Sequence, residues 1–281
     1  MAGCSAPVEQ DEVAEARSPS TQGVVLVERQ ASAESTQVGI SAKFMRVPGS
    51  VELDSAQRLV GSRLDQPAVG ACAVVGASDP VAALPHASHA AIELLDVGEL
   101  AVQVDGGQPI WLVTRAFPDV GDLVSGVFYT TRDDAAALTT GSFLVSSSGS
   151  SQLDHFEVAA AAPADLDEVR LDDDLLTDGP ALVPGRSIAV RWQAADEPAA
   201  EDRVFIDVTG ASGVTTRCAY GDVGEATLRG DVLDEQALGS NATIEVHRVR
   251  RSFFGTNAID AGEIRFDLSV LGRVTFERAA E

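Results

Sequence analysis

Long apolar runs and positive charge are what this 281-residue sequence has least of. Its apolar runs, such as Val24–Val27, fall far short of the ~20 residues that a bilayer-spanning helix needs. Lysine and arginine together number 20 against 43 aspartates and glutamates, so the formal net charge is -23. Such a field repels phosphate backbones and anionic lipid surfaces, and the basic cluster His247–Arg251 is too small to reverse it. We therefore expect no nucleic-acid partner.

Catalytic motifs are also missing. The sequence has no Gly-x-Ser-x-Gly nucleophile elbow, no phosphate-binding loop, no His-Glu-x-x-His zinc motif and no Cys-x-x-Cys pair. Aromatic residues make up only 5%, which is too few for the aromatic platforms of glycan-binding modules. Trp192 shares a strand face with Ile188 and Val190, so we expect it in a core. The sequence therefore gives no positive reason to propose an enzyme.

Short stretches of alternating apolar and polar residues are abundant. In Ile264–Val270 the alternation is unbroken, and only a β-strand places its four apolar residues on one face. The stretches 133–138 and 231–238 are expected to be short helices that do not organise the fold. The sequence predicts an all-β fold of two antiparallel β-sandwich (or barrel-like) domains in tandem, behind a disordered N-terminal tether. Other expected strands include Gly39–Arg46, Ala71–Val75, Leu100–Val104, Phe156–Ala160, Val204–Val208 and Thr215–Tyr220.

Composition divides the chain into three parts. Residues 1–23 are small, polar and acidic, and we expect a lipobox remnant followed by a disordered acidic tether. Residues 24–150 are expected to form the first β domain and residues 151–281 the second, because Ser146–Ser151 is a flexible stretch without apolar residues. A second position for the linker is Ala162–Ala164, which lies beyond the next expected strand and contains a proline.

Two groups of residues are weak candidates for a metal site. The first is a His-x-x-His pair, but it lies in an expected loop with no acidic or cysteine ligand nearby. The second is an acidic stretch with hard oxygen ligands for Ca²⁺, but its three consecutive aspartates lack the alternating spacing of a calcium loop. Solvated loops are the favoured interpretation of both groups, and calcium is the one cofactor that stays open. The candidate ligands are His86, His89, Asp172, Asp173, Asp174 and Asp178. The other two histidines, His155 and His247, are expected to be exposed on polar strand faces.

The sequence has three cysteines, Cys4, Cys72 and Cys218. If Cys4 carries a lipid, the other two can join in a disulfide in an exported protein. The alternative is that each is a small buried residue on its own strand. Because Cys72 and Cys218 fall in different predicted domains, the sequence favours the alternative over the disulfide.

The chain resembles the uncharacterised two-domain β-rich surface lipoproteins of high-GC Gram-negative bacteria. The resemblance covers most of the chain and rests on Ala2-Gly3-Cys4 with its tether, Ile40–Phe44, Gly70–Val74, Leu95–Leu100, Phe156–Val158 leading to Pro163, Val190–Trp192 and Arg217–Asp222. These lipoproteins have no assigned activity. The resemblance therefore implies a β-rich fold and a lipid anchor, and it implies no catalytic residue.

Cys4 is the expected site of lipid attachment and the expected link to a membrane. The third residue before a lipobox cysteine is usually leucine or a similar apolar residue, and here it is Met1. When a start codon other than the methionine codon is used, the initiator methionine stands in place of the residue that this codon otherwise encodes. Met1 can therefore hide the usual residue of this lipobox position, and we expect translation to begin upstream. Ser5 after the cysteine favours the outer membrane or the cell surface over the inner membrane. A start at Met1 itself implies a cytoplasmic protein.

Three classes of function remain open at this point. The favoured class is a non-enzymatic binding or structural module of the cell envelope, with a protein or glycan partner. The second is a hydrolase or an enzyme-accessory domain whose site is assembled from several loops. The third is a calcium-stabilised, adhesin-like module.

Overall fold

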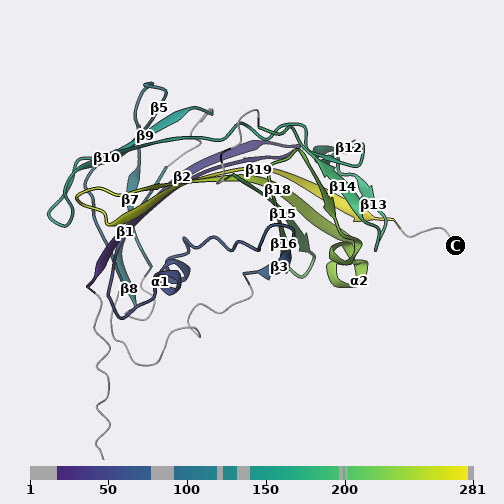
Figure 1. The fold of residues 1–281 in the computed structure, drawn as a ribbon, viewed down its shortest axis with the longest axis horizontal. Helices are drawn as coiled ribbons and strands as arrows, with labels where there is room; N and C mark the ends of the chain where they lie inside the picture. The colour runs from purple at the N-terminus through teal and green to yellow at the C-terminus, as the bar shows by residue number, and fades with distance from the viewer. Residues whose placement is uncertain are drawn as a thin grey trace, which may run out of the picture.

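The computed structural model describes residues 18–76, 92–118, 123–131, 140–195, 199 and 202–277, and strands of three β-sheets make up most of them (Figure 1). The all-β class that the alternating pattern predicts is therefore confirmed. None of the helices in these ranges has the length and the apolar character needed to cross a membrane. Cys4, residues 1–17 of the expected tether and the expected helix at 133–138 lie outside the described residues.

The largest sheet, sheet A, contains eleven strands and extends through the whole molecule (Figure 1). Its longest strands have 14 and 16 residues and form an antiparallel hairpin at its centre. In spatial order the strands are β3 (Cys72–Val75), β16 (Thr215–Tyr220), β15 (Arg203–Gly210), β18 (Asn241–Phe254), β19 (Ala261–Phe276), β1 (Ser20–Ala31), β2 (Thr36–Val47), β4 (Ile92–Leu94), β8 (Val124–Thr130) and β7 (Val113–Ala116), with β13 (Ala181–Leu182) beside the end of β19.

Sheet A is a mixed sheet, and the prediction of purely antiparallel sheets is wrong on this point. β1 forms an antiparallel hairpin with β2, but on its other side it runs parallel to β19, with Val25 opposite Ile264. β4 is parallel to β8, and β13 is parallel to β19. An alternating pattern carries no information on strand direction, because each strand alternates in the same way in both kinds of sheet.

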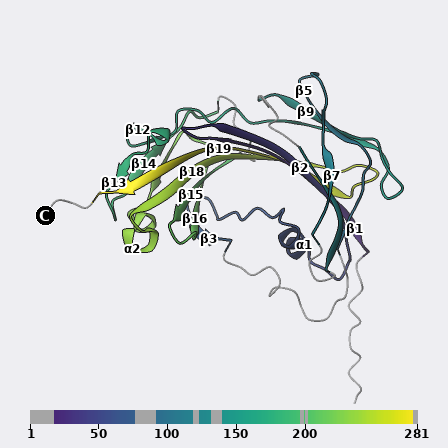
Figure 2. The ribbon, with the colours of Figure 1, turned by 180° about the vertical axis from the view of Figure 1, so that it is seen from behind.

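Two smaller sheets lie on the convex face of the curved sheet A, as Figures 1 and 2 show from opposite sides. The short helix α1 (Leu53–Leu59) lies on the concave face, which we call the inner face. Sheet B contains β10 (Phe156–Ala161), β9 (Ser142–Ser147), β5 (Leu100–Val104) and β6 (Ile110–Trp111); sheet C contains β12 (Asp174–Leu175), β11 (Arg170–Leu171), β14 (Ile188–Arg191) and β17 (Glu225–Leu228). The remaining elements are η1 (Leu176–Asp178), η2 (Gly230–Leu233) and α2 (Glu235–Leu238).

Each small sheet closes a separate apolar core against sheet A. In the first core, Phe143 of sheet B lies 4.9 Å from Phe266 of β19, and Phe156 lies 5.3 Å from Phe44 of β2, measured between ring centroids. The second core lies between sheet C and the other half of β19, and it contains Trp192, as the sequence predicts. β19 therefore contributes apolar side chains to both cores.

The boundary that the sequence places at residue 150 falls inside a β-hairpin of sheet B. β9 and β10 pair on either side of it, and the Ser/Gly stretch is bonded to the neighbouring loop: Ser147 Oγ donates to Val97 O at 2.8 Å and Ser150 Oγ to Asp96 O at 2.7 Å. The chain passes from sheet B to sheet C at residues 162–169, where the sequence offers its second linker position. The limits of independent domains stay a prediction, and strands from both sides of residue 150 share sheet A.

Three arginines of sheet A hold the crossing segment, residues 162–169, on the convex face. Arg29 forms an ion pair with Asp165. Arg248 donates hydrogen bonds to two main-chain oxygens of the segment, at 2.6 and 3.1 Å, and Arg250 donates to a third at 3.1 Å. The crossing segment is therefore fixed between the two cores.

Candidate functional site

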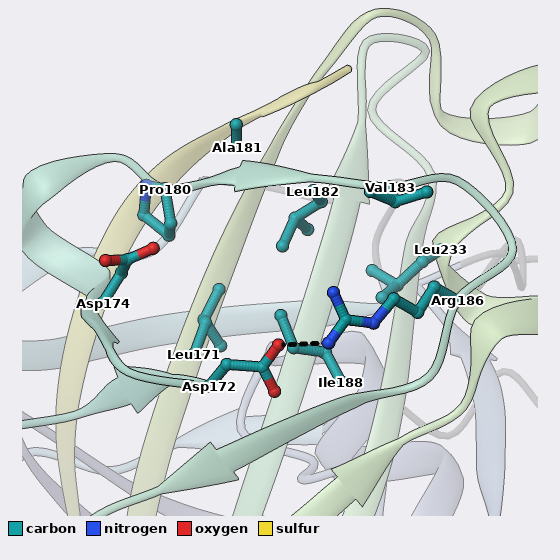
Figure 3. A pocket seen from close by; sticks show the side chains of 10 residues that line it. All are labelled: Leu171, Asp172, Asp174, Pro180, Ala181, Leu182, Val183, Arg186, Ile188 and Leu233. Atoms are coloured by element: carbon teal, nitrogen blue, oxygen red, sulfur yellow. Dashed lines mark hydrogen bonds and ion pairs between the residues drawn. The ribbon is translucent and has the colours of Figure 1, made fainter. Parts of the chain in front are cut away.

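The end pocket lies between β13 and the hairpin of β11 and β12 in sheet C (Figure 3). Its volume is about 130 Å³. Four of the lining side chains are aliphatic and less than a tenth exposed; they are Leu171, Leu182, Ile188 and Leu233. The floor and one wall of the pocket are therefore apolar and belong to the edge of the second core.

An ion pair stands at the mouth of the end pocket. Arg186 Nη2 lies 3.0 Å from Asp172 Oδ2, and the two side chains are 62% and 36% exposed. Asp172 is itself fixed, because its Oδ1 accepts a hydrogen bond from Ala189 N at 3.1 Å and its own N–H donates to Ala189 O at 2.7 Å. Figure 3 shows the other terminal nitrogen of Arg186 turned toward the apolar lining. The pocket thus combines an apolar interior with one accessible positive and one accessible negative group.

The four aspartates considered for calcium do not converge on one point. Asp172 contacts Arg186, and the fully exposed Asp173 lies 3.4 Å from a nitrogen of Arg191. Asp174 and Asp178 are exposed residues of β12 and η1. Within the described ranges, no group of three or more His, Cys, Asp or Glu side chains is placed to hold a metal ion.

A second concentration of charge, the ionic cluster, lies on the inner face of sheet A. It arises because β19 alternates: Ile264 and Phe266 point into the first core, while Glu263 and Arg265 point to the inner face and are only 4% exposed. The members of the cluster are Glu28, Lys43, Asp207, Arg217, Glu245, His247, Arg251, Glu263, Arg265 and Asp267. The polar face of this strand is therefore covered as well as its apolar face.

Carboxylates and guanidinium groups of the ionic cluster pair closely. Glu263 lies 2.6 Å from both Arg251 Nη2 and Arg265 Nε, and Asp207 lies 2.7 Å from Arg217 Nη2. Burial alone would raise the pKa of Glu263, but the bonds from the two arginines hold it below its usual range. Such charges are stable in a buried place only because each has a partner.

His247 lies among three carboxylates of the ionic cluster. Its Nδ1 is 2.8 Å from Asp267 Oδ1, and its Nε2 is 3.7 Å from Asp207 Oδ2 and from Glu245 Oε2. Burial would lower the pKa of the imidazole, but Asp267, then Glu245 and Asp207, raise it to about 9. An imidazole that stays protonated at neutral pH is a poor general base, so this geometry fits a structural cation.

The strap, residues 60–71, crosses the inner face from α1 to β3. Its Leu64 packs against an apolar patch of Phe205, Ala219 and Val249. Four cations from four strands of sheet A donate to oxygen atoms of the strap. The bonds are Lys43 Nζ to Val60 O (2.6 Å), Arg265 Nη1 to Ser62 O (3.0 Å), Arg217 Nη1 to Asp65 O (3.2 Å) and Arg251 Nη1 to Gln66 Oε1 (3.3 Å).

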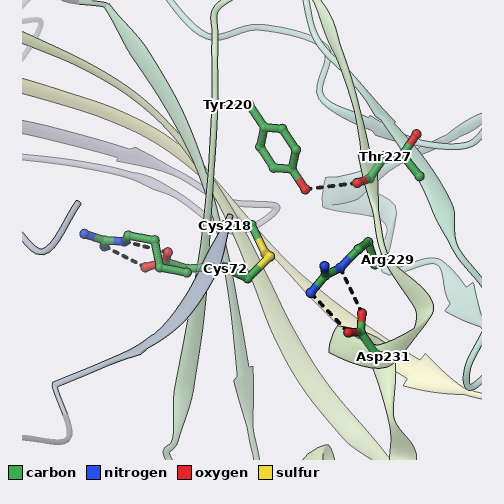
Figure 4. Close-up of a disulfide and its surroundings, with 8 residues drawn as sticks. Cys72, Cys218, Tyr220, Thr227, Arg229 and Asp231 are labelled. Atoms are coloured by element: carbon green, nitrogen blue, oxygen red, sulfur yellow. Dashed lines mark hydrogen bonds and ion pairs between the residues drawn. A yellow bond between two sulfur atoms is a disulfide. The ribbon is translucent and has the colours of Figure 1, made fainter. Parts of the chain in front are cut away.

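A disulfide fixes the end of the strap. Cys72 of β3 and Cys218 of β16 are direct neighbours in sheet A, with Cα atoms 4.0 Å apart, and their sulfur atoms are bonded (Figure 4). The sequence favours two unpaired cysteines because it assigns them to different domains. The strap removes that objection, since it carries β3 across the inner face to the edge of sheet A.

Sequence reasoning also missed a buried ion pair between the two cores. Arg248 is fully buried, and its Nε lies 2.8 Å from Asp222 Oδ2. The other oxygen of Asp222 accepts a hydrogen bond from Trp192 Nε1 at 2.7 Å. The alternating pattern puts Arg248 among the core-facing residues of β18. Because arginine is rarely buried without a partner, an arginine at such a position was the signal that could have predicted this ion pair.

The remaining predicted residues fall into two groups. Cys4, His86 and His89 lie outside the described residues. His155 is exposed, as expected, whereas the prediction that His247 is exposed is wrong because the residue is only 8% exposed.

Comparison with known proteins does not assign this chain to a family. No protein-family model matches the sequence, and no curated protein matches it. The resemblance to surface lipoproteins therefore stays a prediction, and the function is inferred from the end pocket, the ionic cluster and the disulfide.

Proposed function

We propose that this chain is an exported protein of the cell envelope, held at the outer membrane or cell surface by a lipid on Cys4. In this proposal it serves as a non-enzymatic binding or structural module with a protein or glycan partner. We further propose that sheet B and sheet C, each packed against sheet A, mark two sandwich-like units of this module.

The disulfide between Cys72 and Cys218 is the observation that carries the proposal. Disulfides persist in oxidising compartments such as the periplasm and the cell surface, and they are rare in the cytosol. This one closes a loop with a sequence separation of 146 residues and joins the strap to the edge of sheet A. Its position supports a structural cross-link in an exported protein.

The ionic cluster supports a structural role over a catalytic one. Clusters of ionisable groups with shifted pKa values often mark active sites, but structural ion-pair networks shift pKa values too. Here Arg217, Arg251 and Arg265 each bind a carboxylate on one side and the strap on the other. The charges are therefore explained by the need to hold an irregular segment against a sheet.

Metabolic labelling with a fatty acid tests the proposed attachment. In cells that make the protein from its own gene, we expect label on the wild type, none on Cys4→Ser, and wild-type labelling of the Cys72→Ser/Cys218→Ser variant. Envelope fractions of the wild type are expected to contain the protein in its oxidised form, measured by thiol alkylation without reductant. Label that persists in Cys4→Ser, or a protein found reduced in the cytoplasm, contradicts the proposal.

A further inference from the structure

The size of the end pocket sets the size of what it can hold. A cavity of about 150 Å³ lined by aliphatic and aromatic side chains holds one benzene molecule. The end pocket, at about 130 Å³, is slightly smaller; it is open to solvent, and Asp172, Asp174 and Arg186 line it together with aliphatic side chains. It therefore fits one branched aliphatic group or one six-membered ring.

The ion pair at the mouth sets the charge of the ligand. Arg186 and Asp172 are both accessible to solvent. Each side chain makes fewer hydrogen bonds to the described residues than it can form. Arg186 has five N–H donors and donates one of them to Asp172. Asp172 has about four acceptor positions and uses two of them, for Arg186 and for Ala189 N. A carboxylate fits the guanidinium, and an ammonium group fits the carboxylate.

A ligand that carries both charges on one carbon matches this pair. Arg186 and Asp172 lie 3.0 Å apart, so they present a positive and a negative group side by side at one edge of the apolar opening. The head group of an α-amino acid carries an ammonium and a carboxylate on the same carbon, with the side chain leaving from that carbon. Figure 3 shows the corresponding layout, with the ion pair on one side and Leu171, Leu182 and Ile188 beside it.

We propose that the end pocket binds a free apolar α-amino acid of leucine or phenylalanine size. Its carboxylate pairs with Arg186, its ammonium with Asp172, and its side chain fills the space above Leu171, Ile188 and Leu233. This inference goes beyond the proposed function, which names a protein or glycan partner, and it adds a small-molecule ligand to the proposed binding module. Asp174, on the opposite rim beside Pro180, adds negative charge that disfavours acidic amino acids.

Titration of the purified full-length chain with L-leucine tests this inference, with calorimetry and the methyl signals of Ile188 as readouts. Two analogues each lack one charge: 4-methylpentanoate lacks the ammonium, and 3-methylbutylamine lacks the carboxylate. We expect leucine to bind with a Kd in the millimolar range or lower. Either analogue is expected to bind at least about tenfold more weakly than leucine, because it loses one charge-assisted hydrogen bond. Tryptophan, whose indole is larger than a single six-membered ring, is expected to bind more weakly than leucine.

A matched pair of variants locates the site. Arg229 is a good control for Arg186, because it also pairs with a local aspartate, at 3.1 Å from Asp231, and is 60% exposed, and it does not line the pocket (Figure 4). Arg186→Gln is expected to weaken leucine binding about tenfold or more, and Arg229→Gln to leave it unchanged. Both variants are expected to keep the wild-type melting temperature within a few degrees, since exposed ion pairs contribute little.

Three outcomes overturn the inference: no leucine binding at millimolar concentration, equal binding of leucine and its two analogues, or equal loss in both arginine variants. Because the titration uses purified protein, it is independent of lipid attachment. Failure of leucine binding leaves the Cys4 labelling result standing. Failure of the labelling leaves the binding curve unchanged.

Discussion

Raising the pH from 6 to 10 is expected to destabilise this protein through one residue, His247. The imidazole has a pKa of 6.5 in an ordinary environment, and the surrounding carboxylates raise it to about 9 in the fold. Because the folded pKa lies above the unfolded one, the folded state binds the proton more tightly. The resulting stabilisation is fully present below pH 6.5 and is lost as the pH rises through about 9.

The size of the loss follows from the two pKa values. Each pKa unit corresponds to 1.36 kcal/mol of differential interaction, so the rise from 6.5 to about 9 amounts to about 3 kcal/mol. The interaction between His247 and Asp267 also shifts the pKa of Asp267. Burial alone would raise its pKa, but His247 holds it below its usual range, so the pair also loses stability when the pH falls low enough to protonate Asp267. The pair is thus most stabilising between these limits.

Urea unfolding monitored by tryptophan fluorescence measures this effect. Urea is preferable to guanidinium chloride because it does not screen charges. We expect the free energy of unfolding of the wild type to fall by about 3 kcal/mol between pH 6.5 and about pH 9.5, and to level off above that. His247→Gln is the control, since it removes the titrating group, and its stability is expected to lack this fall. Other groups, such as Lys43, titrate in both proteins and cancel in the difference. Equal pH dependence in wild type and His247→Gln refutes the assignment of His247 as a structural cation.

Three further predictions follow from the cross-link, the buried ion pair and the acidic turn. The Cys72→Ser/Cys218→Ser variant is expected to lose about 2–5 kcal/mol of stability in urea unfolding, and an unchanged midpoint contradicts a structural role for the disulfide. Arg248→Met leaves Asp222 buried without its cation and is expected to lower the free energy of unfolding by about 3–5 kcal/mol. Adding Asp222→Asn is expected to recover part of this loss. If the losses of the two substitutions instead add up in thermal or urea unfolding, the two side chains are not paired. Millimolar CaCl₂ is expected to leave the melting temperature where equimolar MgCl₂ leaves it, and a calcium-specific rise indicates a site formed outside the described residues.

The strands were predictable because their apolar faces are regular. Ile264, Phe266 and the next two apolar residues of β19 are all buried on one face, as the period of two requires. What the pattern leaves open is what covers the other face. Glu263 and Arg265 look like solvent-exposed residues, and they are buried because the strap, which has no periodicity of its own, lies over them.

The end pocket and the disulfide depend on contacts between distant segments, which no local pattern encodes. Leu171, Leu182 and Ile188 lie in strands of two to four residues, too short to show alternation. Of the three consecutive aspartates, Asp172 and Asp173 form the turn between β11 and β12 and Asp174 begins β12; Asp172 adopts a left-handed backbone (φ 52°). Aspartate tolerates that conformation better than most residues, which explains Asp172 at this place without a metal.

The parallel pairing of β1 with β19 has a consequence for the order of folding. β1 lies at the centre of sheet A, and its partner follows about 240 residues later in the chain. During synthesis, the β1–β2 hairpin therefore keeps one edge open until β19 is available. Sheet A therefore closes around β1 only once β19 has been made, so a contact between two segments far apart in the sequence is among the last that the fold can form.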